Sequence, residues 1–185
     1  MAATALRGAA AVVSPGEAAE RLLDCVCDAL STIDRPVCKC YQTMGTPVVG
    51  RCCECEDTDV EGSGELSIHF RRLFDADPST LLEVQRVRPC KGGTVAAQYR
   101  LVLARCFPTL DEDGELPDPE DLITAAEEQH LDVDAMWQAL ACCTGLDLRI
   151  DSITSDLSPR GGCSFLYADV TVAIRVPALP ASGSF

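Results

Sequence analysis

The side chains with the greatest chemical potential in this chain are its 12 cysteines, most of which stand close together in the sequence. They fall into four groups, Cys25/Cys27, Cys38/Cys40, Cys52/Cys53/Cys55 and Cys142/Cys143. Thiols at this density can bind metal ions, form disulfides, carry out redox chemistry or fill space as small apolar side chains. Only two histidines accompany them, so the spacing of the cysteines has to decide between these uses.

Zinc binding is the first use to weigh. A structural zinc site usually needs two cysteine pairs of the C-x₂₋₄-C type, and only Cys52 and Cys55 have that spacing. Alternate side chains of a strand share a face, so a hairpin could still bring four thiols together. We keep this site, formed by Cys38, Cys40, Cys53 and Cys55, as an alternative, and otherwise expect no metal and no cofactor.

The spacing favours buried free cysteines that pack as small apolar side chains. The N-terminal residues do not have the pattern of a signal peptide, so we expect synthesis in a cytosol, where thiols stay reduced. An even number of cysteines indicates disulfides only in small secreted chains. One or more disulfides, formed only after release from a cell, remain the second alternative.

Catalytic chemistry has little support in the sequence. The run Cys52–Cys55 is followed by an acidic loop rather than by the helix N-terminus that activates a redox thiol. His69 is expected on the polar face of a strand, and His130 on the exposed side of a helix. No nucleophile elbow and no phosphate-binding glycine loop is present. We therefore expect no enzyme and no catalytic residue.

The charge of the chain restricts its partners. A formal net charge of −14 and a pI near 4.4 disfavour nucleic-acid binding, which needs a basic face. The acidic runs at 57–61 and 111–115 do not match a calcium loop and are expected to be solvated. The basic clusters are expected to pair with acids across a subunit interface or to be solvated; they are Arg71/Arg72 and Arg86/Arg88.

Length and hydropathy predict one folded domain. Hydrophobic residues make up 47% and charged residues 24%, as in a folded globular protein. No window holds about 18 uncharged apolar residues, so no membrane span is expected. We expect a flexible N-terminus over 1–13, a single domain over 14–176 and a loose C-terminal tail over 177–185.

Two helices are predicted from caps and apolar periodicity. The first covers 15–32, with Ser14 as its cap and Pro15 at its first position. Cys25 and Cys27 lie about 200° apart on this helix and cannot share one small ion. The second covers about 119–144 after Asp118, with an apolar stripe of Leu122, Ala126, Val133, Met136, Leu140 and Cys143.

Apolar alternation predicts strands at 37–41, 48–56, 66–71, 80–87, 96–106, 146–153 and 165–176. The segment 96–106 is apolar on both faces after Arg100, which places it at the centre of the sheet. The predicted fold class is α+β, with a mixed or antiparallel sheet flanked by the N-terminal helix and the long second helix.

Six short segments carry a resemblance to a known family. They are Ala19–Cys27, Arg35–Cys38, Arg105–Thr109, Asp113–Pro117, Ala139–Cys143 and Pro159–Cys163, and the resemblance covers roughly residues 16–176. Cysteines at set places within turns and helix ends are the most specific part. On these residues the chain resembles the small tail terminator proteins of siphophages that infect actinobacteria. It departs from them at 61–87, which looks lengthened and more charged.

The resemblance implies a virion structural protein without catalytic residues, made in the host cytoplasm and located at the tail–neck junction. Such proteins form a homohexameric ring that caps the tail tube at its head-proximal end and stops its polymerisation. The implied partners are the major tail tube protein and a head-closure or neck connector protein. Genomic DNA would pass through the lumen without specific binding, and no membrane is involved.

An acidic lumen would suit such a ring, because like charge keeps DNA from sticking. The acidic loops at 57–65 and 111–115 are the candidates for a rim that faces the lumen or the tube. Two alternatives remain at this point: a head-closure or connector ring of the neck, and a zinc-binding interaction module.

Overall fold

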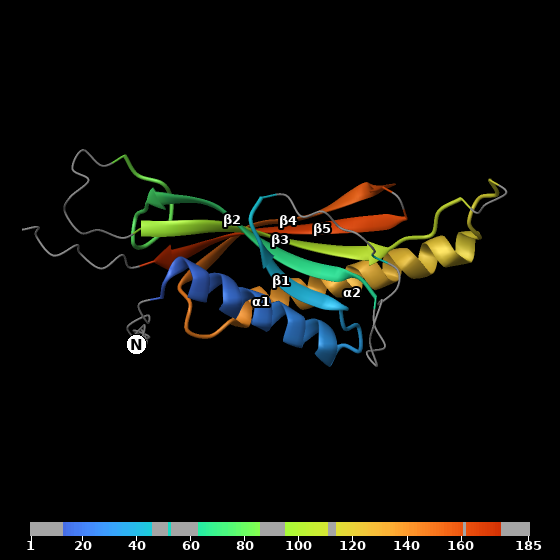
Figure 1. Cartoon of the computed structure of the whole chain (residues 1–185), viewed down its shortest axis with the longest axis horizontal. Coiled ribbons are helices and arrows are strands. Elements are labelled where there is room, and N and C mark those ends of the chain that lie inside the picture. Colours follow the sequence, from blue (N-terminus) through green and yellow to red (C-terminus); the bar gives the residue numbers. More distant parts are fainter. Residues whose placement is uncertain are drawn as a thin grey trace, which may run out of the picture.

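The computed structural model describes residues 13–45, 52, 63–85, 95–110, 114–160 and 162–174. These residues form two helices and one five-stranded mixed sheet, which confirms the predicted fold class. The helices are α1 (Pro15–Thr32) and α2 (Pro119–Cys142). The strands are β1 (Lys39–Thr43), β2 (Glu65–Asp75), β3 (Val95–Cys106), β4 (Leu148–Arg160) and β5 (Cys163–Ile174). Both helices lie on the same side of the sheet (Figure 1).

Helix α1 begins and ends where its sequence predicts. The Ser14 hydroxyl accepts a hydrogen bond from the Glu17 backbone N–H at 3.2 Å, and Pro15 occupies the first turn. One face of the helix is buried, and its members recur at helical spacing: Ala18, Ala19, Leu22, Leu23, Val26 and Leu30. Val13, which we assigned to the flexible N-terminus, is buried in the same core, so that boundary was wrong by at least one residue.

The sheet has β3 at its centre, as its two-sided apolar pattern predicts. The strand order is β1-β2-β3-β5-β4, with β1 parallel to β2 and all other pairs antiparallel. The register aligns apolar residues across neighbouring strands, as in the row Ile68, Leu101 and Ala168. Because side chains in such a row share a face, β2, β3 and β5 present one continuous apolar surface to the helices.

One predicted strand is absent over its described residues, and two other segments are described only in part or not at all. The segment 80–85 is not a strand, because it contributes only one isolated bridge, between Glu83 and Ala76. Leu81 there adopts a left-handed backbone with φ of 55°, which does not continue a strand. The last predicted strand ends at Ile174 within the described residues. The predicted strand at 48–56 and the tail at 177–185 lie outside the described residues, apart from Cys52.

Only the second half of α2 packs against the core. Its buried members are Asp132, Ala135, Met136 and Leu140, all in the last 11 residues of the helix. The predicted stripe was therefore wrong at its start, since Leu122 and Ala126 are exposed. Figure 1 shows why for the start of the helix: the first turns of α2 run past the end of the sheet.

The opposite face of the sheet carries an ordered network of polar side chains. Arg100 donates two hydrogen bonds to Asp169, at 2.8 and 2.6 Å, from directly opposite positions on β3 and β5. Next to this pair, the Asp151 carboxylate accepts hydrogen bonds from Thr171 at 2.7 Å and from Arg149 at 2.7 Å. These cross-strand pairs align the strands on the side that neither helix covers.

The main expectation for the cysteines, that they are buried free thiols, is wrong, because most of the described cysteines form disulfides. The disulfides are Cys25–Cys143, Cys27–Cys40 and Cys52–Cys163, and Cys38 and Cys106 are disulfide-bonded as well. Cys142 is the one described cysteine with a free thiol, and it is exposed. The helical geometry correctly separated Cys25 from Cys27, which bond to different partners on either side of α1.

The disulfides Cys25–Cys143 and Cys52–Cys163 should each contribute more to stability than Cys27–Cys40, since they close loops of 118 and 111 residues against 13. Loop-closure entropy predicts a loss of at most about 5 kcal/mol for C25S/C143S and about 3 kcal/mol for C27S/C40S. Urea unfolding without reductant measures both losses. The control is C142S, which should leave the unfolding midpoint unchanged. Equal unfolding midpoints for C25S/C143S and the parent would contradict a stabilising role for this disulfide.

Candidate functional site

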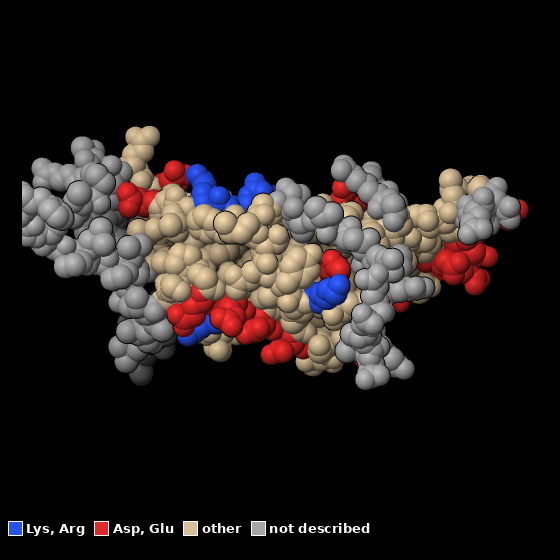
Figure 2. Space-filling view, in the orientation of Figure 1, with Lys and Arg blue, Asp and Glu red and all other residues tan. Residues whose placement is uncertain are grey.

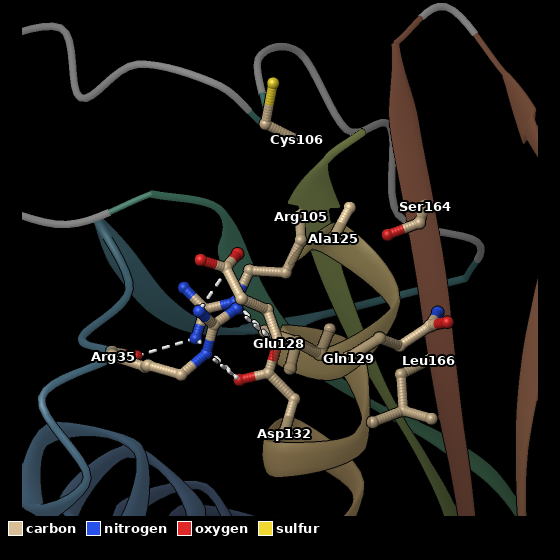
Figure 3. A pocket seen from close by; sticks show the side chains of 10 residues that line it. Arg35, Arg105, Cys106, Ala125, Glu128, Gln129, Asp132, Ser164 and Leu166 are labelled. Atoms are coloured by element: carbon tan, nitrogen blue, oxygen red, sulfur yellow. Dashed lines mark hydrogen bonds and ion pairs between the residues drawn. The ribbon is translucent and has the colours of Figure 1, made fainter. Parts of the chain in front are cut away.

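The most concentrated group of charged side chains lies at one end of the core, between α1, β3 and α2 (Figure 3). Asp132 of α2 is 1% exposed and accepts four hydrogen bonds. Two come from Arg105, at the end of β3, and both are 3.1 Å long. Two come from Arg35, which follows α1, at 3.0 and 3.1 Å. Glu128, one turn earlier on α2, forms an ion pair with Arg35 at 3.1 Å.

Arg105 uses every donor that its guanidinium group has. Besides its two bonds to Asp132, it donates to the carbonyl oxygens of Pro36 at 3.0 Å, Arg35 at 2.6 Å and Ser63. An arginine has five N–H donors, and all five are taken here. The side chain therefore joins the turn after α1, the segment before β2 and helix α2 to the end of β3. We call Arg35, Arg105 and Asp132 the buried charge cluster.

The two arginines of the cluster differ in their electrostatics. Burial lowers the pKa of Arg105, and the charge and hydrogen bonds of Asp132 offset only part of that effect. Burial also acts to lower the pKa of Arg35, but its hydrogen bonds and charge interactions with Asp132 and Glu128 outweigh it and raise the pKa. The difference follows from exposure, because the side chain of Arg35 is 16% exposed and that of Arg105 is 8% exposed.

The space beside this cluster is too small for a substrate. The hollow between the cluster, Gln129 and Ser164 has a volume of about 10 Å³, which is roughly the space of a single water molecule. Its charged groups are turned toward one another and not toward an opening. The cluster is thus organised as an internal clamp rather than as a reaction centre.

Sequence reasoning missed this cluster, although a signal for it exists. Asp132 lies four residues before Met136 and eight before Leu140, so it interrupts the buried stripe of α2 with a carboxylate. Arg105 continues the alternation of Leu101 and Leu103 on the face of β3 that meets the helices. Opposite charges on two apolar faces that pack together are a sign of a buried pair.

Breaking the buried charge cluster should destabilise the fold strongly. Arg105→Met removes five hydrogen bonds and leaves Asp132 with one arginine, so we expect a loss of about 3–5 kcal/mol in the free energy of unfolding. The matched control is Arg72→Ala, which breaks an exposed pair with Glu83 and should cost at most about 1 kcal/mol. Urea denaturation measures both. A loss for Arg105→Met no larger than that of the control would contradict the clamp.

His69 does not have the solvated position that its polar strand face predicts. It lies on the face of β2 opposite Ile68, as expected, but it is only 5% exposed. Its Nε2 atom has no hydrogen-bond partner among the described residues. Burial, and next the positive charge of Arg71, lower the pKa of His69, while a hydrogen bond with the Gly45 backbone offsets part of the shift. His130 is exposed, as predicted.

The lowered pKa of His69 predicts a loss of stability in mild acid. The unfolded chain takes up a proton as the pH falls through the ordinary value of 6.5, whereas the folded chain resists protonation until a lower pH. The free energy of unfolding should therefore fall as the pH drops through about 6.5, and His69→Gln should make that fall shallower. Parallel urea titrations of both proteins test this. An identical pH dependence would show that His69 is not the group responsible.

The four-thiolate zinc site that the sequence left as an alternative lacks two of its thiolates. Cys40 is bonded to Cys27 and Cys38 is also in a disulfide, so neither offers a thiolate to a metal ion. Cys53 and Cys55 lie outside the described residues. Within the described ranges, no three His, Cys, Asp or Glu side chains are grouped closely enough to hold a metal ion. The geometry gives the cysteines a cross-linking role instead.

The charged segments singled out in the sequence are only partly described. Residues 57–62, residues 111–113 and the pair Arg86/Arg88 lie outside the described ranges, so their predicted roles stay predictions. Glu65 lies at the start of β2 and accepts a hydrogen bond from Tyr41 at 3.1 Å. Arg72 pairs within the chain, with Glu83 at 2.9 Å, and lies 4.8 Å from the ring centre of Phe74. Arg71 is exposed.

The first half of α2 and the segment before it form an exposed apolar surface, which we call the α2 tip. Its members are between 38% and 83% exposed: Leu110, Leu116, Leu122 and Ile123. Leu110, Leu116 and Leu122 border a shallow, mainly apolar hollow of about 540 Å³ that Pro108, Pro117 and Gly162 complete. A soluble monomer rarely leaves several large apolar side chains together in water, and such a patch usually marks a contact with another molecule.

Acidic residues surround the α2 tip. Asp118, Glu120 and Asp121 begin the helix and are exposed, and the Asp118 carboxylate caps it by accepting from the Glu120 N–H at 3.0 Å. Figure 2 shows a dense acidic group there, while the positive charges visible on that face lie away from it. The tip therefore favours a partner that is apolar and positively charged.

No protein-family model and no curated protein matches this chain. Within the described part of the chain, neither helix combines the length and the apolar character that crossing a membrane requires.

Proposed function

We propose that this chain is a structural subunit of a phage virion, a tail terminator that assembles into a homohexameric ring at the head-proximal end of the tail tube. In this role it ends tail polymerisation and joins the tail to a head-closure or neck protein. It performs no catalysis and holds no cofactor.

The observation that carries the proposal is the α2 tip. A 24-residue helix buries no side chain in the core along its first half and leaves its first turns beyond the sheet, with Leu122 and Ile123 in solvent. Exposing these side chains has a cost that an isolated domain would avoid, and contact with a neighbouring molecule removes it. A subunit built for assembly explains why the helix is longer than its core requires.

Two further features support an assembly role. The order of elements (helix, three strands, long helix, two strands) is the one that the resemblance to tail terminators leads us to expect. The buried charges, which an enzyme would direct at a substrate, satisfy one another in the clamp of Arg35, Arg105 and Asp132. The net charge of −14 suits a ring through which DNA slides without binding.

Loss of expression in the phage that encodes the protein tests the proposal. Without a terminator, tube polymerisation has no stop, so electron microscopy should show tails of abnormal length. Tails of normal length beside unjoined heads would contradict the terminator role and indicate a head-closure ring instead. Native mass spectrometry of the purified chain separates both from a zinc-binding module: a metal-free hexamer is expected, and a monomer with stoichiometric zinc would overturn the ring.

A further inference from the structure

The α2 tip combines apolar side chains in solvent with an excess of negative charge. Leu110 is 57% exposed and Leu116 is 83% exposed. The segments around the hollow, 107–110, 114–123 and 160–163, hold one basic residue, Arg160, against the acids Glu115, Asp118, Glu120 and Asp121. The segment that binds there should therefore be apolar, carry positive charge and be free of acids.

The residues that follow β5 have this composition. Residues 175–185 lie outside the described residues, and their sequence contains one charged residue, Arg175, and no acid. Pro177 and Pro180 enclose Ala178 and Leu179. Each proline fixes its own φ at about −65° and restricts the residue before it to extended conformations. Such a P-x-x-P segment loses little conformational entropy on binding, which favours its capture by apolar grooves. We call residues 175–180 the tail segment.

Strand β5 separates the tail segment from the α2 tip of the same chain. Gly162, which lines the hollow, lies directly before the strand, and Arg175 follows its last residue, Ile174. The 12 residues of β5 span roughly 37 Å, whereas the chain from Ile174 to Leu179 reaches at most about 18 Å. In Figure 1 the end of β5 and the first turns of α2 lie at opposite ends of the molecule. Leu179 therefore cannot enter the hollow of its own chain.

We propose that the tail segment of one copy binds the α2 tip of another copy. Leu179 and the two prolines occupy the apolar hollow, and Arg175 faces the carboxylates of Glu120 and Asp121. This inference rests on the proposed function, a ring of identical subunits, and names the segment and the surface that join them.

Charge favours this head-to-tail contact over a symmetric one. Two α2 tips that met face to face would bring Asp118, Glu120 and Asp121 against their own copies, and like charges repel. The tail segment brings apolar side chains and one positive charge instead. A contact between two different parts of identical chains repeats from copy to copy and closes into a ring when its rotation allows.

Complementation between two defective variants tests the contact. Leu116→Asp should disable the α2 tip and Leu179→Asp the tail segment, because each places a carboxylate where the contact buries an apolar side chain. Each variant alone should assemble at least about 10-fold more weakly than the parent. In a mixture, the intact tail segment of the first variant can bind the intact tip of the second. Native mass spectrometry should then show a dimer of one copy of each, which grows no further.

A labelled peptide of residues 175–185 tests the contact separately from the ring. It should bind to the full-length Leu179→Asp protein, whose tip is intact, and at least about 10-fold more weakly to L116D/L179D. The matched control is L131D/L179D, which changes an exposed leucine of α2 outside the tip and should bind the peptide like Leu179→Asp. Fluorescence polarisation measures all three affinities.

Charge reversal gives a second route that leaves the apolar groups intact. Arg175→Glu and E120K/D121K should each weaken assembly, and their combination in one chain should restore it. Peptide binding that does not depend on Leu116, or no dimer in the mixture of variants, would overturn this contact and leave the ring standing. A parent that stays monomeric at all concentrations would overturn the ring itself.

Discussion

The structure depends on one buried carboxylate and the two arginines that hold it. Asp132 sits where α2 passes the end of β3, and its four hydrogen bonds fix the helix against the turn after α1 as well. A buried charge is costly unless it is paired and hydrogen-bonded, so this position tolerates little displacement. The first turns of α2 then extend past the sheet, and the exposed α2 tip is a consequence of that anchor.

The disulfides hold the same arrangement from other points. Cys25–Cys143 fastens the end of α2 to α1, and Cys27–Cys40 fastens α1 to β1. With the helix clamped at Asp132 and cross-linked at its C-terminal end, only its first half is free of the core. Such bonds would suit the proposed virion protein, because thiols oxidise outside the cell.

Much of the fold could be predicted because local signals and tertiary packing agree. Caps at Ser14 and Asp118 set the starts of both helices, and the two-sided apolar pattern of β3 placed it at the centre of the sheet. The failures arose where distance in sequence hides contact in space. Cysteine spacing does not reveal that Cys25 meets Cys143, and strand alternation gives the face of His69 but not its burial. The clamp was missed because its partners come from three separate segments.

In the proposed role the first half of α2 is an assembly surface, while its second half belongs to the core. The most direct test of this division of α2 is amide hydrogen exchange along the helix, measured in dilute protein and in the proposed ring. We predict that amides in 122–131 exchange rapidly when the protein is dispersed and become protected on assembly, whereas those in 132–142 are protected in both states. Unchanged exchange in 122–131 on assembly would contradict the account.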